Sequence, residues 1–177
     1  FQSAFSKTYY WILFYVGASF GTSYALGDFK DTDPSNPDAY FADKGTKLDV
    51  YGGFFLNDKV TLIGMFRYQS FDSQISSLVN DFNADTPGFN FSGSTQDWKV
   101  YYLLCGVSYK VNISKKFSLF PRLSIGPMVV KNPEITISSP NVHIIQNFKR
   151  SSESGFGFGY DFGIGLRRDL GKHFSKN

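Results

Sequence analysis

Bulky apolar side chains occupy every second position between residues 156 and 166. Four of the five residues between them are glycine, and the fifth is Asp161. A period of two predicts a β-strand, because successive side chains of a strand point to opposite faces of a sheet. A bulky face towards lipid and a small face towards a narrow interior are typical of membrane barrels. We therefore expect six side chains of this strand to face lipid: Phe156, Phe158, Tyr160, Phe162, Ile164 and Leu166.

The same alternation recurs in five earlier segments and predicts six strands in total. In segment 97–112 both faces carry apolar residues, and we assign the odd-numbered residues from Tyr101 to Val111 to the outward face. Segment 117–131 contains Pro121 and Pro127, which remove hydrogen-bond donors and indicate bulges or locally broken pairing. The predicted strands are residues 9–26, 46–56, 60–71, 97–112, 117–131 and 155–166.

The connections between these strands alternate between long and short. Residues 27–45, 72–96 and 132–154 are long, whereas 57–59 and 113–116 are short turns. This order is typical of bacterial up-and-down barrels, whose long loops are extracellular and whose short turns are periplasmic. It predicts a periplasmic N-terminus. Within the long loops we expect a helical turn near 75–82 and a projecting β-hairpin made of 134–138 and 142–145.

The number of strands is smaller than a closed barrel requires. Six strands fall below the roughly eight of the smallest barrels of this kind, and the sequence stops just after a turn at 170–173. We expect residues 1–177 to form a single barrel domain that lacks its last strands. Alternatively, the loop hairpin or a neighbouring chain covers the open edges, because an unpaired edge in lipid costs several kcal/mol per group.

The composition agrees with a membrane barrel. Aromatic residues make up 19% of the chain and charged residues 19%. No window approaches the roughly 18 consecutive apolar residues of a spanning helix. The aromatic residues fall into two expected interfacial belts, Tyr24, Tyr68, Trp98 and Tyr101 at the outer strand ends and Phe54, Tyr109 and Phe117 at the periplasmic ends. The alternative, a soluble barrel, would turn these side chains into a core.

Charge, cysteine content and the N-terminal segment add three narrower expectations. The formal net charge is +3 without a lysine or arginine cluster, so we expect no nucleic-acid partner. Cys105 is the only cysteine, which excludes an internal disulfide and suits a small apolar residue on the lipid side. Lys7 and the apolar run 9–16 loosely resemble a signal peptide, but the alternation continues to Leu26 and favours the first strand of a mature exported protein.

Short turns allow the strand register to be predicted. If Leu56 pairs with Val60, Asp49 lies opposite Arg67 in the lumen. If Val111 pairs with Phe117, Gly106 lies opposite Arg122, which leaves room for the guanidinium to reach towards Asp161. Unpaired charges in a low-dielectric interior are costly, so we expect ion pairs among Asp49, Arg67, Arg122 and Asp161. These pairs form either a plug or a proton or ion pathway, and the narrow interior of an eight-stranded barrel favours the plug.

Catalytic chemistry has little support in the sequence. His143 lies in the third long loop and His173 at a turn, too far apart in this topology to share a site. A protease site at the outer rim would combine His143 with acidic loop residues, which are usually only solvated: Asp31, Asp33, Asp72 and Glu134. The glycines of 155–165 alternate strictly, unlike a nucleotide-binding G-x-G-x-x-G motif. We expect no catalytic residue, no cofactor and no metal ligand.

Taken together, three features resemble the small outer-membrane β-barrels of the OmpA/OmpX type and, more loosely, PorT-like barrels. They are the glycine-alternating strand 155–166, the segment Phe14-Tyr15-Val16-Gly17-Ala18-Ser19-Phe20-Gly21 and the alternation of loops and turns. The resemblance covers nearly all of the chain but is architectural. It implies an eight-stranded, antiparallel, all-β barrel without an open pore or catalytic residues. Relatives stabilise membranes, act as adhesins or serve as accessory subunits.

Two functional hypotheses follow. The first is a non-enzymatic barrel in the outer membrane of a Gram-negative bacterium, with a structural or accessory-subunit role and long loops as its contact surface. The second is a barrel that binds or transports a small ligand. The expected partners are outer-membrane lipid, lipopolysaccharide and other outer-membrane proteins, contacted through the loops or the lipid-facing surface. Lumen occupancy distinguishes the hypotheses, because filling by Arg67, Arg122 and Asp161 favours the first and an open water column the second.

Overall fold

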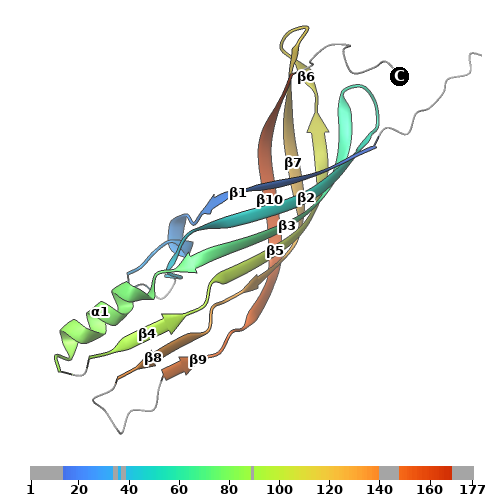
Figure 1. Cartoon of the computed structure of the whole chain (residues 1–177). Coiled ribbons are helices and arrows are strands. Elements are labelled where there is room, and N and C mark those ends of the chain that lie inside the picture. The colour runs from blue at the N-terminus through green and yellow to red at the C-terminus, as the bar shows by residue number, and fades with distance from the viewer. Residues whose placement is uncertain (1–13, 34–35, 37–38, 89, 140–147, 169–177) are drawn as a thin grey trace, which may run out of the picture.

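A computed structural model of the chain describes residues 14–33, 36, 39–88, 90–139 and 148–168 (Figure 1). Its main element is a sheet of long strands that follow one another in the order β1-β2-β3-β5-β7-β10, with β6 added beside β7. Each long strand is antiparallel to the next. The strands are β1 (Phe14–Tyr24), β2 (Ala42–Phe55), β3 (Val60–Ser73), β5 (Trp98–Tyr109), β6 (Val111–Asn112), β7 (Phe117–Lys131) and β10 (Ser154–Arg168). The predicted all-β, up-and-down architecture is confirmed.

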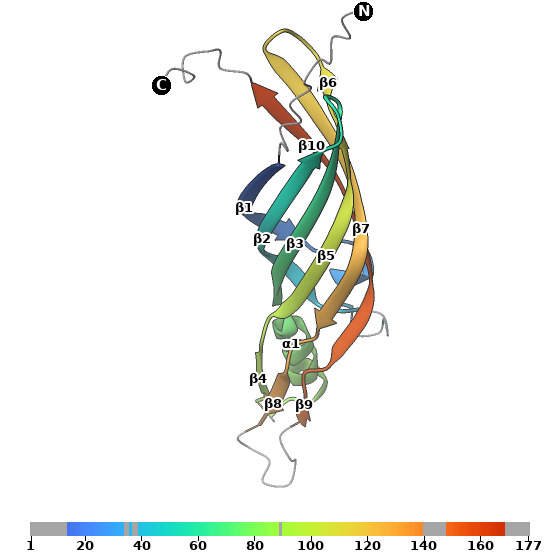
Figure 2. The same cartoon turned by 90° about the vertical axis from the view of Figure 1, so that its right-hand side faces the viewer.

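The sheet is curled into a half-barrel with a concave and a convex face (Figures 1 and 2). β1 and β10 form its two edges, and within the described residues each pairs with one neighbouring strand. The predicted strand positions agree closely with the observed ones, and β7 has the predicted bounds. The predicted strand 97–112 divides at Lys110 into β5 and β6, and the predicted residues 9–13 of the first strand lie outside the described residues.

The two prolines of β7 disturb the sheet on one side only. The pairing of β7 with β10 is continuous past both Pro121 and Pro127, so no bulge forms there. Towards β5, regular pairing is interrupted opposite Pro127, between the pairs Tyr102–Met128 and Cys105–Ile125. Because proline has no N–H group, the interruption is the expected result on the side where that donor would point.

The apolar residues cover the convex face. The six alternating side chains of β10 are between 64% and 82% exposed. The outward side chains assigned to segment 97–112 are also exposed, including Cys105. Trp98 is the exception among the aromatic residues expected in the belts. It is only 8% exposed and lies on the concave face, because its even number places it opposite to Tyr101 in the alternation of β5.

An extension of folded loops continues the sheet at the end opposite to the short turns (Figure 1). It contains a second sheet in the order β4-β8-β9 and the helix α1, with η1 in the first loop. α1 packs closely on β4 at Gly93. A Cβ at this position would lie only 2.7 Å from the Val79 side chain and 2.8 Å from that of Ile75. The bounds are η1 (Gly27–Phe29), α1 (Ile75–Asp85), β4 (Ser92–Thr95), β8 (Ile135–Ser138) and β9 (Phe148–Arg150).

The extension differs in detail from the predicted loops. The predicted helical turn is a complete helix that continues to Asp85. The predicted hairpin strand 134–138 corresponds to β8, but its predicted partner 142–145 lies outside the described residues, and β8 pairs with β4 and β9. No helix among the described residues is long and apolar enough to cross a bilayer.

An apolar cluster closes the concave face where the half-barrel meets the extension. Its buried members are Ala25, Ala42, Phe71, Trp98 and Val100. Phe29, carried by η1, packs edge-on against Phe71 and Trp98 with ring centroids 5.2 and 5.3 Å apart. The Trp98 indole N–H donates to the Tyr40 carbonyl at 3.1 Å, which ties the first long loop to β5.

Candidate functional site

Between this cluster and the short turns, the concave face carries the charged residues predicted for the lumen. The turn between β2 and β3 sets the positions of Asp49 and Arg67 relative to each other. The Asn57 side-chain oxygen accepts hydrogen bonds from the backbone N–H groups of Lys59 and Val60 at 2.9 and 2.8 Å. The Leu56 N–H donates to the Val60 carbonyl at 2.9 Å. These bonds fix the predicted register, in which Asp49 lies opposite Arg67.

The register predicted across the turn between β6 and β7 was wrong. Gly106 lies opposite Ser124, and Arg122 lies opposite Ser108. The reason is that the turn closes with Ile113 opposite Phe117, whose carbonyl accepts the Ile113 N–H at 3.0 Å. The error is two residues, and an even shift leaves every side chain on its predicted face.

A glycine does make room for Arg122, but it belongs to β10. Gly163 is paired with Arg122, and a Cβ on this glycine would lie 2.7 Å from the Arg122 Nε. Gly106 instead allows β5 and β7 to approach closely, because its Cβ would overlap the backbone of β7 at Leu123 and Ser124. Gly163 therefore has the role that was expected of Gly106.

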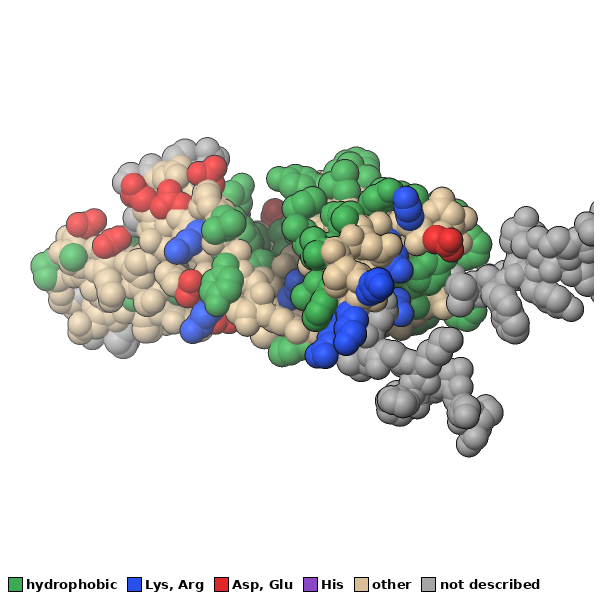
Figure 3. Space-filling model, turned by 90° about the horizontal axis from the view of Figure 1, so that it is seen from above, with side chains coloured by type: hydrophobic (Ala, Val, Ile, Leu, Met, Phe, Trp, Pro, Cys, Tyr) green, Lys and Arg blue, Asp and Glu red, His purple; other side chains and the backbone are tan. Residues whose placement is uncertain are grey.

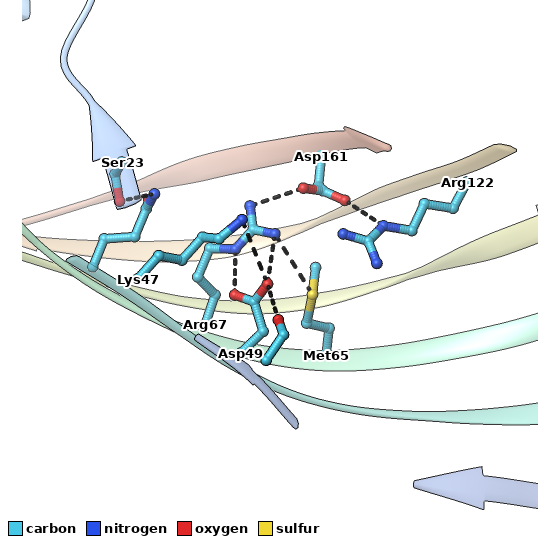
Figure 4. Close-up of polar contacts among 9 residues, drawn as sticks. Ser23, Lys47, Asp49, Met65, Arg67, Arg122 and Asp161 are labelled. Carbon is cyan, nitrogen blue, oxygen red and sulfur yellow. Dashed lines mark hydrogen bonds and ion pairs between the residues drawn. The ribbon is translucent and has the colours of Figure 1, made fainter. Parts of the chain in front are cut away.

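The structure brings the four charged residues into one chain of ion pairs (Figure 4). Arg67 Nε lies 2.7 Å from Asp49 Oδ1, and Arg67 Nη1 lies 2.8 Å from Asp161 Oδ1. Arg122 Nε lies 3.1 Å from Asp161 Oδ2. Arg67 thus joins β3 to β10, strands that are separated in the sheet by β5 and β7. The ion pairs cross the concave face.

Two further residues, which the sequence analysis did not place in the network, complete it. The Ser19 hydroxyl on β1 donates to Asp49 at 3.3 Å, and Lys47 Nζ lies 3.8 Å from the same carboxylate. Asp49 is only 2% exposed and Arg67 8%, so their charges need partners to remain ionised. Inward alternation on β1 and β2 is the sequence pattern that could have identified these residues.

A cavity of about 980 Å³ lies between this network and the short turns. Its walls come from all six long strands. On β2 and β3 it is lined by Tyr51 and Ile63, which lie two and four residues closer to the short turn than Asp49 and Arg67. The network therefore bounds the cavity on the side of the extension. The cavity was not predicted, because its shape depends on the curl of the sheet.

Two of the acidic residues considered for a rim protease, Asp31 and Glu134, have partners nearby in the loops, whereas Asp72 lies in β3. The Asn36 side-chain amide donates to Asp31 at 2.6 Å and, with backbone N–H donors, holds the pKa of this carboxyl below its ordinary value. Glu134 forms an ion pair with Lys149 at 3.0 Å. His143 and His173 lie outside the described residues. In the part of the chain that is described, no three His, Cys, Asp or Glu side chains are grouped as metal ligands would be.

Comparison with known proteins identifies the family. A search of curated proteins finds no match to this chain. The model of the outer membrane protein β-barrel domain, by contrast, matches residues 3–177. This match agrees with the antiparallel half-barrel, its exposed apolar convex face and its charged concave face. The chain therefore belongs to the outer membrane protein β-barrel domain family and is an integral protein of the outer membrane.

Proposed function

We propose that this protein is a non-enzymatic barrel with a structural or accessory-subunit role in an outer-membrane complex, and that the extension is its contact surface. The observation that carries the proposal is the ion-pair network across the concave face. Ion-paired side chains that cross the interior fill the middle of a small barrel and leave no continuous water column. A transport function would need such a column.

The exposed surfaces support separate roles for the convex face, which would contact lipid, and the extension, which would contact a protein partner. The convex apolar residues, including the six of β10, suit lipid and the apolar region of lipopolysaccharide. The extension instead presents polar and acidic residues such as Asn80 and Asp81 on α1, which suit a protein partner in water. The short turns on one side and the folded loops on the other support a periplasmic N-terminus in a Gram-negative cell.

Conductance tests the closed lumen. The purified full chain in planar bilayers is expected to give no stepwise current. Arg67→Ala, which removes the residue that joins β3 to β10, is expected to raise the current, whereas Lys131→Ala at the strand end is not. Regular open-channel steps from the unaltered protein would contradict the proposal and favour the transport alternative.

Photocrosslinking in native outer membranes tests the contact surface. A photoreactive residue at Asn80 or Asp81 is expected to give one discrete protein adduct, because both side chains are exposed on α1. The matched control is the same residue at Leu103, which is 63% exposed on the convex face and should give lipid adducts. Lipid adducts alone from all three positions would contradict an accessory-subunit role.

A further inference from the structure

The cavity between the ion-pair network and the short turns has the size and lining of a binding site. Its volume of about 980 Å³ is at the upper end of the roughly 300–1,000 Å³ usual for small-molecule pockets. We propose that it binds an amphiphilic organic anion, with an apolar body and one carboxylate or phosphate group. The network bounds the site on the side of the extension, and the residues that line the site lie between the network and the short turns.

The charge of the network favours an anion. Three cations, Lys47, Arg67 and Arg122, share two carboxylates, Asp49 and Asp161, which leaves the network with one formal positive charge. Lys47 and Arg122 are 29% and 30% exposed, and an excess charge that is largely removed from water is costly unless a counter-charge accompanies it. An anionic ligand beside the network supplies that counter-charge.

Arg122 is the member of the network that reaches the cavity. Its Nε is held by Asp161, and the guanidinium has no other hydrogen-bond partner among the described residues. Figure 4 draws one contact of the Arg122 guanidinium, from Nε to Asp161, and none from its two terminal nitrogens. The side chain is 30% exposed and lines the cavity. Two N–H donors in a fixed fork match a carboxylate or a phosphate.

Further cations lie at the mouth of the cavity. Lys110 and Arg167 line it, and among the described residues Asp58 is the one acidic member of the lining. In Figure 3, Lys and Arg side chains gather at the short-turn end, while most of the visible Asp and Glu side chains lie over the extension. A cation-lined cavity with apolar walls concentrates anions by focusing the electric field.

The walls of the cavity select an apolar body. Tyr15 lies edge-on to Tyr51 with ring centroids 6.3 Å apart, and its ring lies 5.7 Å from that of Phe55. Ile63 and Phe120 continue the apolar lining. A small inorganic anion would leave most of this surface in contact with water. An amphiphile covers it while its head group contacts Arg122.

The test uses the full chain in nanodiscs of zwitterionic lipid and three linear probes that each contain eight carbon atoms. Octanoate, octyl phosphate and uncharged octanol are titrated while the amide resonances of Gly163 and Gly165 are followed by NMR. These amides lie beside the cavity and therefore report occupancy of the site rather than partition into lipid. We expect the anions to bind at least tenfold more tightly than octanol. The order of octanoate and octyl phosphate distinguishes carboxylate from phosphate ligands.

Substitutions separate the charge from the cavity. Arg122→Gln is expected to weaken the anions at least tenfold and leave octanol within twofold, as expected for loss of charge-assisted hydrogen bonds. Arg122→Lys retains most of the preference, and Lys131→Gln, at the other end of β7, retains all of it. Gly165→Phe fills the cavity and abolishes binding of every probe, since a Cβ there meets Phe120 at an ordinary 3.6 Å. Gly155→Phe on the same face is its control, because nothing lies within 4 Å of its Cβ.

Several results would overturn the proposal. Equal affinity for octanol and the two anions in the unaltered protein rejects an anion site, and an absence of shifts at Gly163 and Gly165 rejects the cavity as a site. Unchanged anion binding by Arg122→Gln rejects the assigned head-group contact. If Arg122→Gln does not fold, because Asp161 loses a partner, Lys110→Gln and the Gly165 and Gly155 pair decide the question.

Discussion

The two ends of the concave face differ in how they are filled, although the same six strands build both. At the extension end, Phe71 and Trp98 are buried and Phe29 packs between the strand ends. At the short-turn end, Tyr15, Tyr51 and other large side chains surround a cavity instead. Phe29 comes from a long loop that folds back over the strands, and a three-residue turn cannot supply such a residue. Loop length, more than strand sequence, decides which end is sealed.

Disrupting the ion-pair network, which lies between the two ends, should lower the free energy of unfolding the most. Asp161→Ala leaves Arg67 Nη1 and Arg122 Nε without their shared carboxylate. Breaking a buried ion pair costs about 3–5 kcal/mol, and we expect about 3 kcal/mol because Arg122 is partly exposed. Urea unfolding in liposomes measures the loss. Asp72→Ala, at the exposed end of β3, should change the free energy of unfolding little, and equal stabilities for the two variants would contradict a structural role for the network.

Unsealing the extension end should have the next largest effect. Phe29→Ala removes the ring that contacts Phe71 and Trp98. We expect a loss of about 2 kcal/mol, below the ~3–5 kcal/mol of a fully buried phenylalanine, because Phe29 is half-buried. In a Trp11→Phe background, Trp98 emission should shift to the red and become quenchable by iodide. Phe82→Ala on α1 is the control, and an unchanged Trp98 spectrum in Phe29→Ala would show that the loop does not seal this end.

The short turns should respond less. Asn57→Ala and Ser114→Ala each remove a side-chain oxygen that accepts two backbone N–H groups. We expect a loss of about 1 kcal/mol for Asn57→Ala and less for Ser114→Ala, whose bonds of 3.3 and 3.2 Å are longer. Thermal or urea unfolding distinguishes the two. A larger loss of stability for Ser114→Ala would mean that hydrogen-bond length does not determine which turn contributes more to stability.

The smallest expected effect is a pH response of the first long loop. Because Asp31 accepts the Asn36 amide and backbone N–H groups, its pKa in the folded protein is lower than its ordinary value of 3.8. A lowered folded pKa means that the contribution is fully present above the ordinary value and is lost as pH falls through the folded one. The Asn36 side-chain amide resonance should therefore move only below about pH 3.8. Asp31→Asn should remove that step, and a step at higher pH would contradict the assignment.

Alternation predicted the strands and their faces because it is a local property of the sequence. It also gave the pairing of Asp49 with Arg67 across a three-residue turn. The turn before Phe117 has the same design, with Ser114 in the place of Asn57. Recognising that likeness would have given the correct register for Arg122. The side chain of serine is a weaker indicator of such a turn than that of asparagine.

The features that the sequence did not predict depend on distant contacts. β4 is Ser-Gly-Ser-Thr and has no apolar alternation, so its strand depends on pairing with β8 and on α1 packing against Gly93. The sequence predicted Arg67 and Asp161 as members of one ion-pair network but not their direct contact, which joins residues that share no turn. This contact requires the curvature of the sheet, which no short segment specifies. The cavity is unpredictable from sequence for the same reason.

The glycine face of β10 also constrains how this sequence can change. A Cβ on Gly159 would lie 2.6 Å from the Tyr102 ring, and one on Gly163 would lie 2.7 Å from Arg122. Each glycine is thus the complement of one long side chain on another strand. Replacing either glycine with a larger residue would require a shorter side chain at the position it contacts. We therefore expect Gly159 with Tyr102, and Gly163 with Arg122, to vary as pairs among homologous sequences.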